Sequence, residues 1–293
     1  MGTISACLVV HHEEARLEAC LESFADLVDE VIVVHDGPCA DASLSIARRY
    51  TDKVYATEAR AGSSEFIRPF ALEQCTQDWV LVIDADERLS PALRESLRAL
   101  TGTGEYDAYG FEWPYVDESG SRLTSSSMSG KKFLFRRARM YTIGLPHMTP
   151  ETYGSSAGLA LEVHHVLDSR AGGAFAGLLA KNRRRGHVAA ARLAQGVDRV
   201  ELYNASLFDD RVKNARKIRL LASHPLLALL FIPAWGFFYW YFVQGYFRAG
   251  RIGLRDALNL PLYYAAFALS SIRFRRNRGP AGRHREGSDP GSK

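Results

Sequence analysis

The fold of this chain is decided by the stretch Trp79-Val80-Leu81-Val82-Ile83-Asp84-Ala85-Asp86-Glu87, in which an apolar run ends in two carboxylates one residue apart. The run has the length of a buried strand, and a strict strand would point Asp84 and Asp86 to the same face. Like charges buried side by side are unfavourable unless a cation or strong donors offset them. Ligands of open α/β sheets bind beyond the carboxyl ends of the strands. A divalent cation carrying a nucleotide diphosphate would suit this pair of acids.

The two acids have a simpler interpretation as caps of the following helix. That helix already has its own start signal in Ser90-Pro91, a Ser at the N-cap followed by Pro at the first helical position. Capping by Asp84 and Asp86 is therefore redundant, and the metal–nucleotide interpretation is favoured.

Strands and helices alternate around this stretch. Strands are predicted at 4–10, 31–34, 53–56 and 79–83, and helices at 13–24, 41–50, 64–75 and 91–100. This alternation predicts an α/β fold with a parallel sheet covered by helices on both faces. After Gly104 the pattern changes to strands at 106–116, 132–136 and 159–166, with loops of binding length at 119–130 and 149–158. A helical segment is predicted at 173–207.

The chain divides by these patterns into three parts. Residues 1–205 are predicted to form one α/β domain with two halves, 1–104 and 105–205. Residues 206–274 are predicted to form a membrane-associated helical region, and 275–293 a disordered basic tail. The start of the chain is expected to be a strand and not a signal peptide, because it lacks a basic n-region.

Composition excludes several classes of protein. The chain has 293 residues, of which 47% are hydrophobic, so it can bury a large core. A net charge of +4 is too small to indicate a nucleic-acid partner. The four cysteines form no Cys-x-x-Cys pair, which argues against a zinc site and fits a reducing compartment.

The C-terminal quarter is unusually apolar. Residues 220–247 contain no Lys, Arg, Asp or Glu, and 226–243 are apolar throughout, near the lower limit for a spanning helix. A second apolar stretch at 257–272 follows a connection with three arginines. Two spans would place these arginines on the far side, against the positive-inside tendency. We therefore expect interfacial or re-entrant helices at the cytoplasmic face of the cell membrane, ahead of two spans or a buried helix pair.

Polar residues that follow the early strands are candidate donor contacts. Asp36 ends the second strand, where a carboxylate can accept the imide N–H of a uracil or can serve as an ordinary turn residue. His12 and the two glutamates after it follow the first strand, where acids also suit the first turn of a helix. Arg68 precedes the acid stretch and is a candidate phosphate contact or a surface arginine.

A later group supplies candidates for acid–base chemistry and for anion binding. Glu151 is a candidate general base in the loop that begins at Pro146 and includes His147; the alternative is a solvated carboxylate. His164-His165 ends a strand, so alternation lets only one of the two face the site. Lys181 and the arginines at 183–185 would bind a lipid phosphate or pyrophosphate, or form a solvated helix face.

Taken together, these motifs resemble family 2 inverting glycosyltransferases. The resemblance rests on Cys7-Leu8-Val9-Val10-His11-His12-Glu13-Glu14, on His35-Asp36-Gly37-Pro38-Cys39-Ala40-Asp41, on Arg68-Pro69-Phe70-Ala71-Leu72-Glu73-Gln74, and on Asp78-Trp79-Val80-Leu81 with Asp84-Ala85-Asp86-Glu87. The continuation to Arg88 and the strand Leu134-Phe135-Arg136-Arg137 resemble a subgroup that acts in lipopolysaccharide-core and related envelope-glycan assembly. Two positions depart from the pattern: His12 replaces an Asn, and Glu151 is displaced from His147.

The resemblance implies that 1–205 are a GT-A catalytic domain, with a mostly parallel mixed sheet, a nucleotide-sugar half at 1–104 and an acceptor half at 105–205. It also implies a role for each matching residue. Asp36 would contact the base, and Arg68 would lie near the diphosphate. Asp84 and Asp86 would handle the ribose–diphosphate and a Mg²⁺ or Mn²⁺ ion, with Asp86 the direct ligand. Glu151 and Asp86 would be the catalytic residues. The remaining donor-binding positions implied by the motifs are Val10, His12, Glu14 and Ala85.

The function expected from residues and resemblance together is transfer of a sugar, with inversion, from a UDP-sugar to a lipid-linked acceptor at a membrane. One alternative is a polyprenyl-phosphate sugar synthase, in which the lipid phosphate is the acceptor and needs no base. Another is a non-catalytic, membrane-docked protein that binds nucleotide sugars. No nucleic-acid partner is expected, and the sequence leaves the oligomeric state open.

Overall fold

The computed structural model describes residues 1–123, 131–167, 175–196 and 200–277. In this part of the chain, a nine-stranded mixed sheet has the order β3-β2-β1-β4-β8-β6-β11-β5, with β7 paired to β11. Its strands are β1 (Ile4–Val10), β2 (Glu30–His35), β3 (Val54–Ala56), β4 (Trp79–Val82), β5 (Glu87–Leu89), β6 (Ala108–Glu112), β7 (Tyr115–Val116), β8 (Lys131–Arg136) and β11 (Ser156–Val166). The first four in this order are parallel, while β8 is antiparallel to both its neighbours. The α/β class is therefore confirmed, and the sheet mixes parallel with antiparallel strands.

The two faces of the sheet are covered by different helices because strand side chains alternate. Leu8 of β1 packs in a core with α1 (Leu17–Glu22), α2 (Ser43–Ala47) and α4 (Pro91–Leu100). Val9 packs on the opposite face with α3 (Ser64–Glu73). Burial on both faces explains why β1 is apolar at nearly every position. The predicted start of α4 is confirmed, since the Ser90 side chain accepts a hydrogen bond from Leu93 N at 3.3 Å.

Several short strands were not predicted. β5 follows the acid stretch directly, and a second, three-stranded sheet consists of β9 (Met140–Ile143), β10 (Glu151–Thr152) and β12 (Leu202–Tyr203). β10 lies inside the segment 149–158 that was predicted to be a loop, and β12 lies inside the segment 173–207 that was predicted to be mostly helical. Strands of two or three residues have no periodicity to recognise, and partners far along the chain define them.

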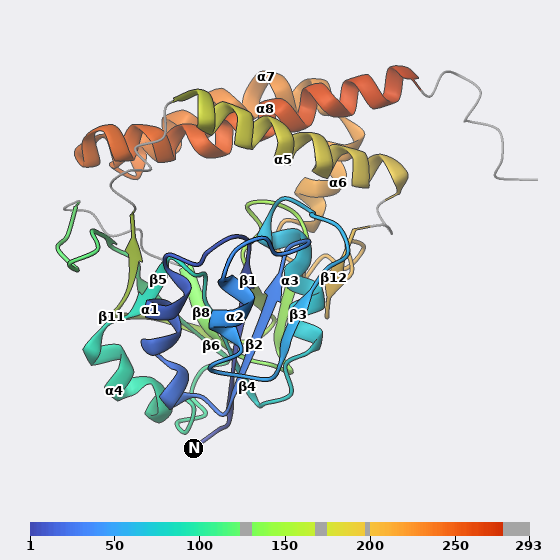
Figure 1. Ribbon diagram of the computed structural model, residues 1–293. Coiled ribbons are helices and arrows are strands. Elements are labelled where there is room, and N and C mark those ends of the chain that lie inside the picture. The colour runs from blue at the N-terminus through green and yellow to red at the C-terminus, as the bar shows by residue number, and fades with distance from the viewer. Residues whose placement is uncertain (124–130, 168–174, 197–199, 278–293) are drawn as a thin grey trace, which may run out of the picture.

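A layer of helices lies across the edge of the sheet at which the parallel strands end, opposite the edge at which the chain begins (Figure 1). The layer consists of α5 (Phe175–Gln195), α6 (Ala215–Ser223), α7 (Pro225–Phe238) and α8 (Gly250–Asn277), with the short helical turns η4 (Tyr239–Val243) and η5 (Tyr246–Ala249). α8 packs against both α5 and α7. The helical layer therefore starts at residue 175, inside the predicted acceptor half, and not at 206.

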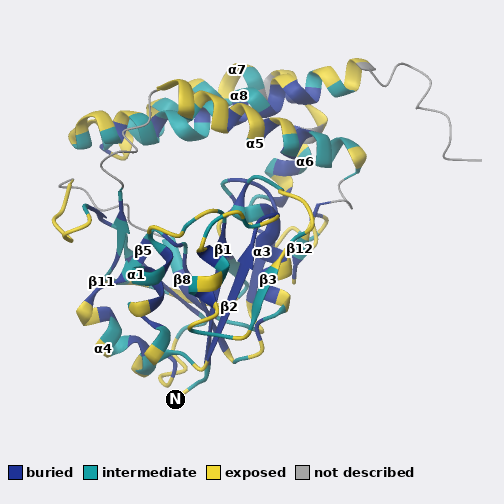
Figure 2. Cartoon of the chain, viewed as in Figure 1, coloured by how far each residue is buried: buried dark blue, intermediate teal, exposed yellow. Residues whose placement is uncertain are grey.

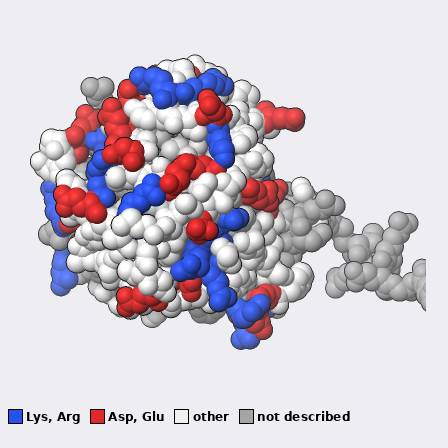
Figure 3. All heavy atoms as spheres, turned by 90° about the horizontal axis from the view of Figure 1, so that it is seen from below, with Lys and Arg blue, Asp and Glu red and all other residues white. Residues whose placement is uncertain are grey.

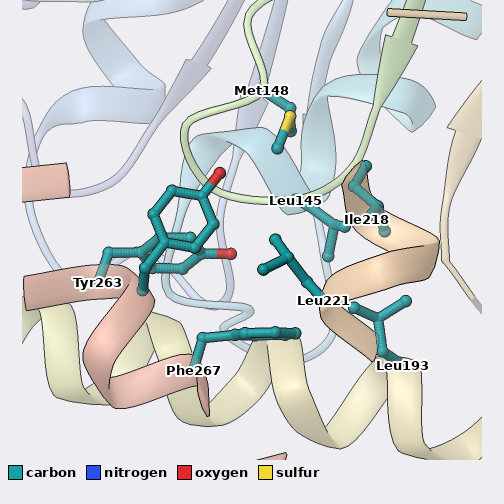
Figure 4. Close-up of a pocket in the computed structure, with 8 residues that line it drawn as sticks. Leu145, Met148, Leu193, Ile218, Leu221, Tyr263 and Phe267 are labelled. Atoms are coloured by element: carbon teal, nitrogen blue, oxygen red, sulfur yellow. The ribbon is translucent and has the colours of Figure 1, made fainter. Parts of the chain in front are cut away.

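The layer is joined to the α/β body by an apolar seam. Leu145 and Met148 of the body meet Ile218 and Leu221 of α6 and Phe267 of α8 (Figure 4). The space between them is too small for a ligand, so the seam fixes the layer in place. Among the described residues, no helix has the length and apolar character needed to cross a membrane. The predicted tail at 275–293 lies outside the described residues from 278 onward.

Candidate active site

The two aspartates of the acid stretch lie in a turn between β4 and β5. The strand ends at Val82, and Glu87 closes the turn, since its backbone N–H donates to Asp84 O at 2.9 Å while its carboxylate accepts from Asp84 N at 2.8 Å. The chain leaves the strand conformation before Asp84. The expectation that a strict strand aligns the two side chains is therefore wrong, and each aspartate has its own partners.

Asp84 is held by two cations from distant elements. Its carboxylate lies 2.8 Å from Arg68 Nη2 on α3 and 3.4 Å from Lys131 Nζ on β8. Burial acts to raise the pKa of Asp84, but Arg68 and Lys131 hold it well below the usual range. Arg68 and Asp84 were predicted together, and the structure joins them. Lys131 was not predicted as a site residue.

Asp86 is paired with a histidine from the far end of the sheet. Its Oδ2 lies 3.2 Å from His165 Nε2 on β11 and 3.9 Å from Arg16 Nη1. His165 is thus the member of the His164-His165 pair that faces the site, because His164 lies against Glu162. Burial acts to raise the pKa of Asp86, but His165 outweighs it and the pKa is lowered. The rings of Trp113 and Tyr115 pack against His165, with centroids at 4.3 and 4.9 Å.

The site remains open to a ligand although its supporting residues are buried. The side chains of Asp84 and Asp86 keep 32% and 33% of their surface accessible. Glu87 is fully buried and forms an ion pair with Lys131. Burial raises the pKa of Glu87 despite this partner. The accessible carboxylates of Asp84 and Asp86 thus lie next to the buried ion pair between Glu87 and Lys131.

Glu13 is a further carboxylate of this site. Burial, followed by the negative charge of Asp86, raises its pKa to about 7. From the sequence, Glu13 was expected to contact the donor or to lie in the first turn of a helix, and not to act as an acid or base. The preceding residue, His12, has a φ of 55°, so the chain turns sharply after β1 before α1 begins. A carboxyl group that titrates near neutrality can exchange a proton with a substrate.

Asp36 is buried at the end of β2, and both of its carboxylate oxygens already accept hydrogen bonds. Oδ1 accepts from Ala61 N at 2.5 Å and Oδ2 from Gly62 N at 2.8 Å. Asp36 therefore holds the loop that leads into α3. Each carboxylate oxygen has a second lone pair, so the predicted contact with a base stays a prediction.

The other predicted donor-binding residues are placed around the same strand ends. Val10 ends β1 with its side chain packed in the core, whereas Glu14 is exposed and its carboxylate accepts a hydrogen bond from Ala42 N at 2.9 Å. Ala85 is buried between the two aspartates. These positions border the acid turn, and their roles toward a donor stay predictions.

Glu151 lies in β10 and forms ion pairs with Lys132, at 2.8 Å, and Lys213. Neither contact joins it to Asp84 or Asp86. Neighbouring side chains of a strand point to opposite faces, and Lys131 reaches the acid turn whereas Lys132 reaches Glu151. The structure therefore does not bring Glu151 together with the other predicted site residues.

His147 is half-buried under the helical layer, where its ring lies 4.9 Å from that of Tyr263 of α8. Burial lowers its pKa to about 4, although nearby Glu65 favours the charged form. Its backbone N–H donates to Glu65 Oε1 at 3.4 Å. Burial acts to raise the pKa of Glu65, but Arg185 and His147 bring it to about 2. This group of charges connects α3 to α5.

The basic residues of α5 have different surroundings. Arg184 Nη2 lies 3.5 Å from Gly62 O, on the loop that Asp36 holds. The pKa of Lys181 is lowered because partial desolvation and the neighbouring charge of Arg185 disfavour its charged form, whereas Glu65 and Asp86 favour it. Part of the basic cluster thus lies over the edge of the sheet at which the acid turn is found.

Comparison with known proteins gives a family for this arrangement. A model described as "Glycosyl transferase family 2" matches residues 5–158, a range that includes Asp36, Arg68, Asp84 and Asp86 but ends before His165. An uncharacterized glycosyltransferase of Rickettsia felis is 26% identical over 88% of this chain and 85% of its own length.

Two other matches are more limited. The lipopolysaccharide core biosynthesis glycosyltransferase LpsC of Rhizobium meliloti is 36% identical over 35% of this chain and 38% of its own length. The crystal structure of S. aureus TarS residues 1–349 in complex with UDP is 17% identical, with a TM-score of 0.45 over 99% of this chain and 95% of that chain. LpsC resembles only about a third of this chain, so its role does not transfer directly.

Proposed function

Because the chain belongs to glycosyltransferase family 2, we propose that this enzyme transfers a sugar from a UDP-sugar to an acceptor carried by a membrane lipid, with inversion at the anomeric carbon. One observation carries the proposal. The partly accessible acids Asp84 and Asp86, braced by Arg68, Lys131 and His165, lie at the edge of the sheet where its parallel strands end. This is where α/β sheets bind nucleotides.

The donor would lie between the acid turn and the Asp36 loop. Arg68 and Lys131 place positive charge beside Asp84, so this aspartate stays ionised and can accept hydrogen bonds from a ribose. Asp36 would meet the base through its remaining lone pairs. The loop that it holds carries Gly62, whose backbone turns with a φ of 87°. This geometry favours glycine and brings the backbone close to a ligand.

A Mg²⁺ or Mn²⁺ ion fits this site at Asp86. Its carboxylate oxygen is a suitable ligand, and His165 Nε2 lies 3.2 Å from it, within reach of a shared cation. Nε2 donates its hydrogen to Asp86 here, and it would have to give that hydrogen up to bind a metal. When bound, the ion would neutralise charge that builds on the departing diphosphate. The positive charges of Lys131 and Arg68 would also stabilise the negative charge of the departing diphosphate.

The acceptor hydroxyl needs a carboxylate to take its proton. Glu151 is engaged by Lys132 and Lys213, whereas Glu13 lies beside Asp86 with a pKa raised to about 7. A carboxylate with a pKa near the working pH is an effective base. We therefore add Glu13 to the predicted base Glu151 as a candidate, and Glu13→Gln compared with Glu151→Gln distinguishes the two.

The lipid-linked acceptor is supported by the outer side of the helical layer. On α7 and η4, large apolar side chains face outward at helical spacing, and they include Leu230, Phe231, Trp235, Phe238 and Phe242. A stripe of this kind suits the interface of a bilayer. If the lipid phosphate itself were the acceptor, Lys181 of α5 would contact it and no base would be needed.

The proposal is tested by UDP release in detergent with Mn²⁺, using a panel of UDP-sugars with and without lipid extract. We expect release that requires one sugar and the extract, and a fall of at least about 100-fold in Asp86→Ala. Asp52→Ala, an exposed aspartate away from the acid turn, is the control. Transfer at the wild-type rate by Asp86→Ala overturns the proposal. Release that polyprenyl phosphate alone supports identifies the lipid phosphate as the acceptor.

A further inference from the structure

Three histidines meet at the ends of two neighbouring strands, on the side of β1 away from the acid turn. His11 and His12 follow β1, and His35 ends β2. Their ligand atoms lie within 4.8 Å of one another. The ring centroids of His11 and His12 are 4.2 Å apart, and each lies about the same distance from His35, at 5.4 and 5.5 Å. The roles proposed for the sugar-transfer reaction do not require three imidazoles at this point.

Hydrogen bonds fix the tautomers of two of these rings. His35 Nδ1 lies 2.7 Å from Gly37 O, and His11 Nδ1 lies 2.9 Å from Asp36 O. A carbonyl oxygen can only accept, so each Nδ1 carries the hydrogen and each Nε2 keeps its lone pair. The His12 N–H donates to His35 Nε2 at 3.3 Å, which agrees with this assignment; a metal bound at this nitrogen would replace that one long hydrogen bond. Histidines that bind metals characteristically donate their second ring N–H to a backbone carbonyl in this way.

The backbone also brings the rings together. His12 is held at a φ of 55°, a left-handed conformation that costs a non-glycine residue about 1–2 kcal/mol. This conformation places the His12 ring against that of His11. Strained backbone of this kind is concentrated at functional sites.

We propose that His11, His12 and His35 form a binding site for one divalent cation of the Zn²⁺ class, separate from the Asp84–Asp86 turn. Imidazole nitrogens suit Zn²⁺ much better than they suit Mg²⁺ or Mn²⁺. The rings of His11 and His12 are stacked with an interplanar angle of 17°, so both would have to turn for their lone pairs to meet at one ion. His12 is exposed, so the fourth position faces solvent. The cysteine spacing argued against zinc, but this ligand set uses no cysteine.

A neighbouring group, His35 with Cys39 and Asp41, also has its ligand atoms within 4.8 Å. The Asp41 carboxylate is already engaged, because it accepts from Ser43 N at 3.1 Å, from the Ser43 hydroxyl at 2.9 Å and from Glu14 N at 3.2 Å. Asp41 therefore organises the turn before α2, and the three histidines are the metal ligands.

The test uses the full chain stripped with a chelator and Zn²⁺ alone as the probe, with affinity measured by competition with a chromophoric chelator. We expect one zinc ion per chain in the wild type and in the double variant Asp84→Ala/Asp86→Ala. His12→Gly should bind at least tenfold more weakly. Glycine suits the left-handed backbone, so His12→Gly should melt no lower than the wild type when metal is absent.

Two matched variants complete the experiment. His11→Ala should also weaken zinc binding, whereas His224→Ala, an exposed histidine on the helical layer, should bind zinc as the wild type does. Added Zn²⁺ should raise the melting temperature of the wild type and not that of His12→Gly. Undiminished affinity in both His12→Gly and His11→Ala overturns the proposal. So does loss of zinc binding in the Asp84→Ala/Asp86→Ala variant, or no binding by the wild type at micromolar zinc.

Discussion

At the scale of single residues, the acid turn works by giving each carboxylate a different partner. The negative charge of Asp84 is balanced by the cations Arg68 and Lys131. They hold its pKa well below the usual range, so the carboxylate is ionised at any ordinary pH. The main partner of Asp86 is His165, whose Nε2 lies 3.2 Å from its carboxylate. The two carboxylates therefore have different roles. Asp84 is always available to accept hydrogen bonds, whereas Asp86 can exchange its contact with His165 for a contact with a ligand.

Glu13 provides a pH-dependent test of this charge cluster. Its pKa is raised from 4.5 to about 7 by burial and by Asp86, so the folded protein binds a proton there more tightly than the unfolded chain does. The resulting stability is fully present below pH 4.5 and is lost as the pH rises through 7. Glu13→Gln removes this loss. Relative to the wild type, the variant should therefore gain about 2 kcal/mol of unfolding free energy between pH 4.5 and 7, a figure reduced for partial exposure.

Urea denaturation at a series of pH values, with a chelator present, measures this gain. The exposed Glu58→Gln is the control, and its difference from the wild type should not vary over the same range. A constant difference for Glu13→Gln across pH 4.5–7 would show that Glu13 is not coupled to the acid turn.

The sequence predicted the part of the site that is local. Asp84, Asp86 and Arg68 belong to one strand end and the helix before it, and their pattern is legible within twenty residues. Lys131 and His165 reach the aspartates from 47 and 79 positions away. Pairing across β8 and β11 brings them there, and no local periodicity marks such partners. Lys132, beside Lys131, faces Glu151 instead, and a one-residue difference of this kind depends on strand register.

At the scale of elements, the helical layer is held together by close contact between α5 and α8. Gly186 of α5 lies against the backbone of α8: a Cβ placed there would come within 2.6 Å of Phe267 N and 2.8 Å of Ala266 Cβ. Buried Asn182, one turn earlier, donates to Asn259 Oδ1 at 2.8 Å. The sequence predicted helices in both regions. It did not reveal their packing, because a lone glycine in a helical pattern gives no sign of what approaches it.

This contact predicts opposite effects for the same substitution at two positions of α5. Gly186→Ala should lower the unfolding free energy by about 1–3 kcal/mol, because the added methyl forces α5 away from α8. Gly177→Ala meets nothing within 4 Å and should raise it by up to about 1 kcal/mol, since alanine favours helix more than glycine does. Thermal unfolding of both variants measures the contrast. Equal effects at the two positions would show that α5 and α8 are not in close contact.

At the scale of the whole molecule, two opposite surfaces differ in character. The face seen from below, away from the helical layer, carries acidic and basic side chains of both signs (Figure 3). The helical layer exposes much of its length (Figure 2), and its exposed residues include the large apolar side chains of α7 and η4. The edge of the sheet that carries the acid turn lies beneath this layer. A molecule built in this way would rest on a bilayer through α7 and keep its sheet in water, with the acid turn close to the lipid surface.

This orientation predicts which residues control membrane binding. Phe231 and Trp235 of α7 each leave 66% of their surface exposed, and inserting two aromatic side chains into a bilayer interface removes a few hundred Å² from water. At about 25 cal/mol per Å², their loss should weaken binding to anionic phospholipid vesicles at least tenfold. Flotation of the double variant Phe231→Ser/Trp235→Ser with such vesicles measures the change. Phe70→Ser, an exposed aromatic on α3, should bind as the wild type does. Unchanged flotation of the double variant, with its melting temperature retained, would mean that α7 meets another partner and that the acceptor reaches the site by a different route.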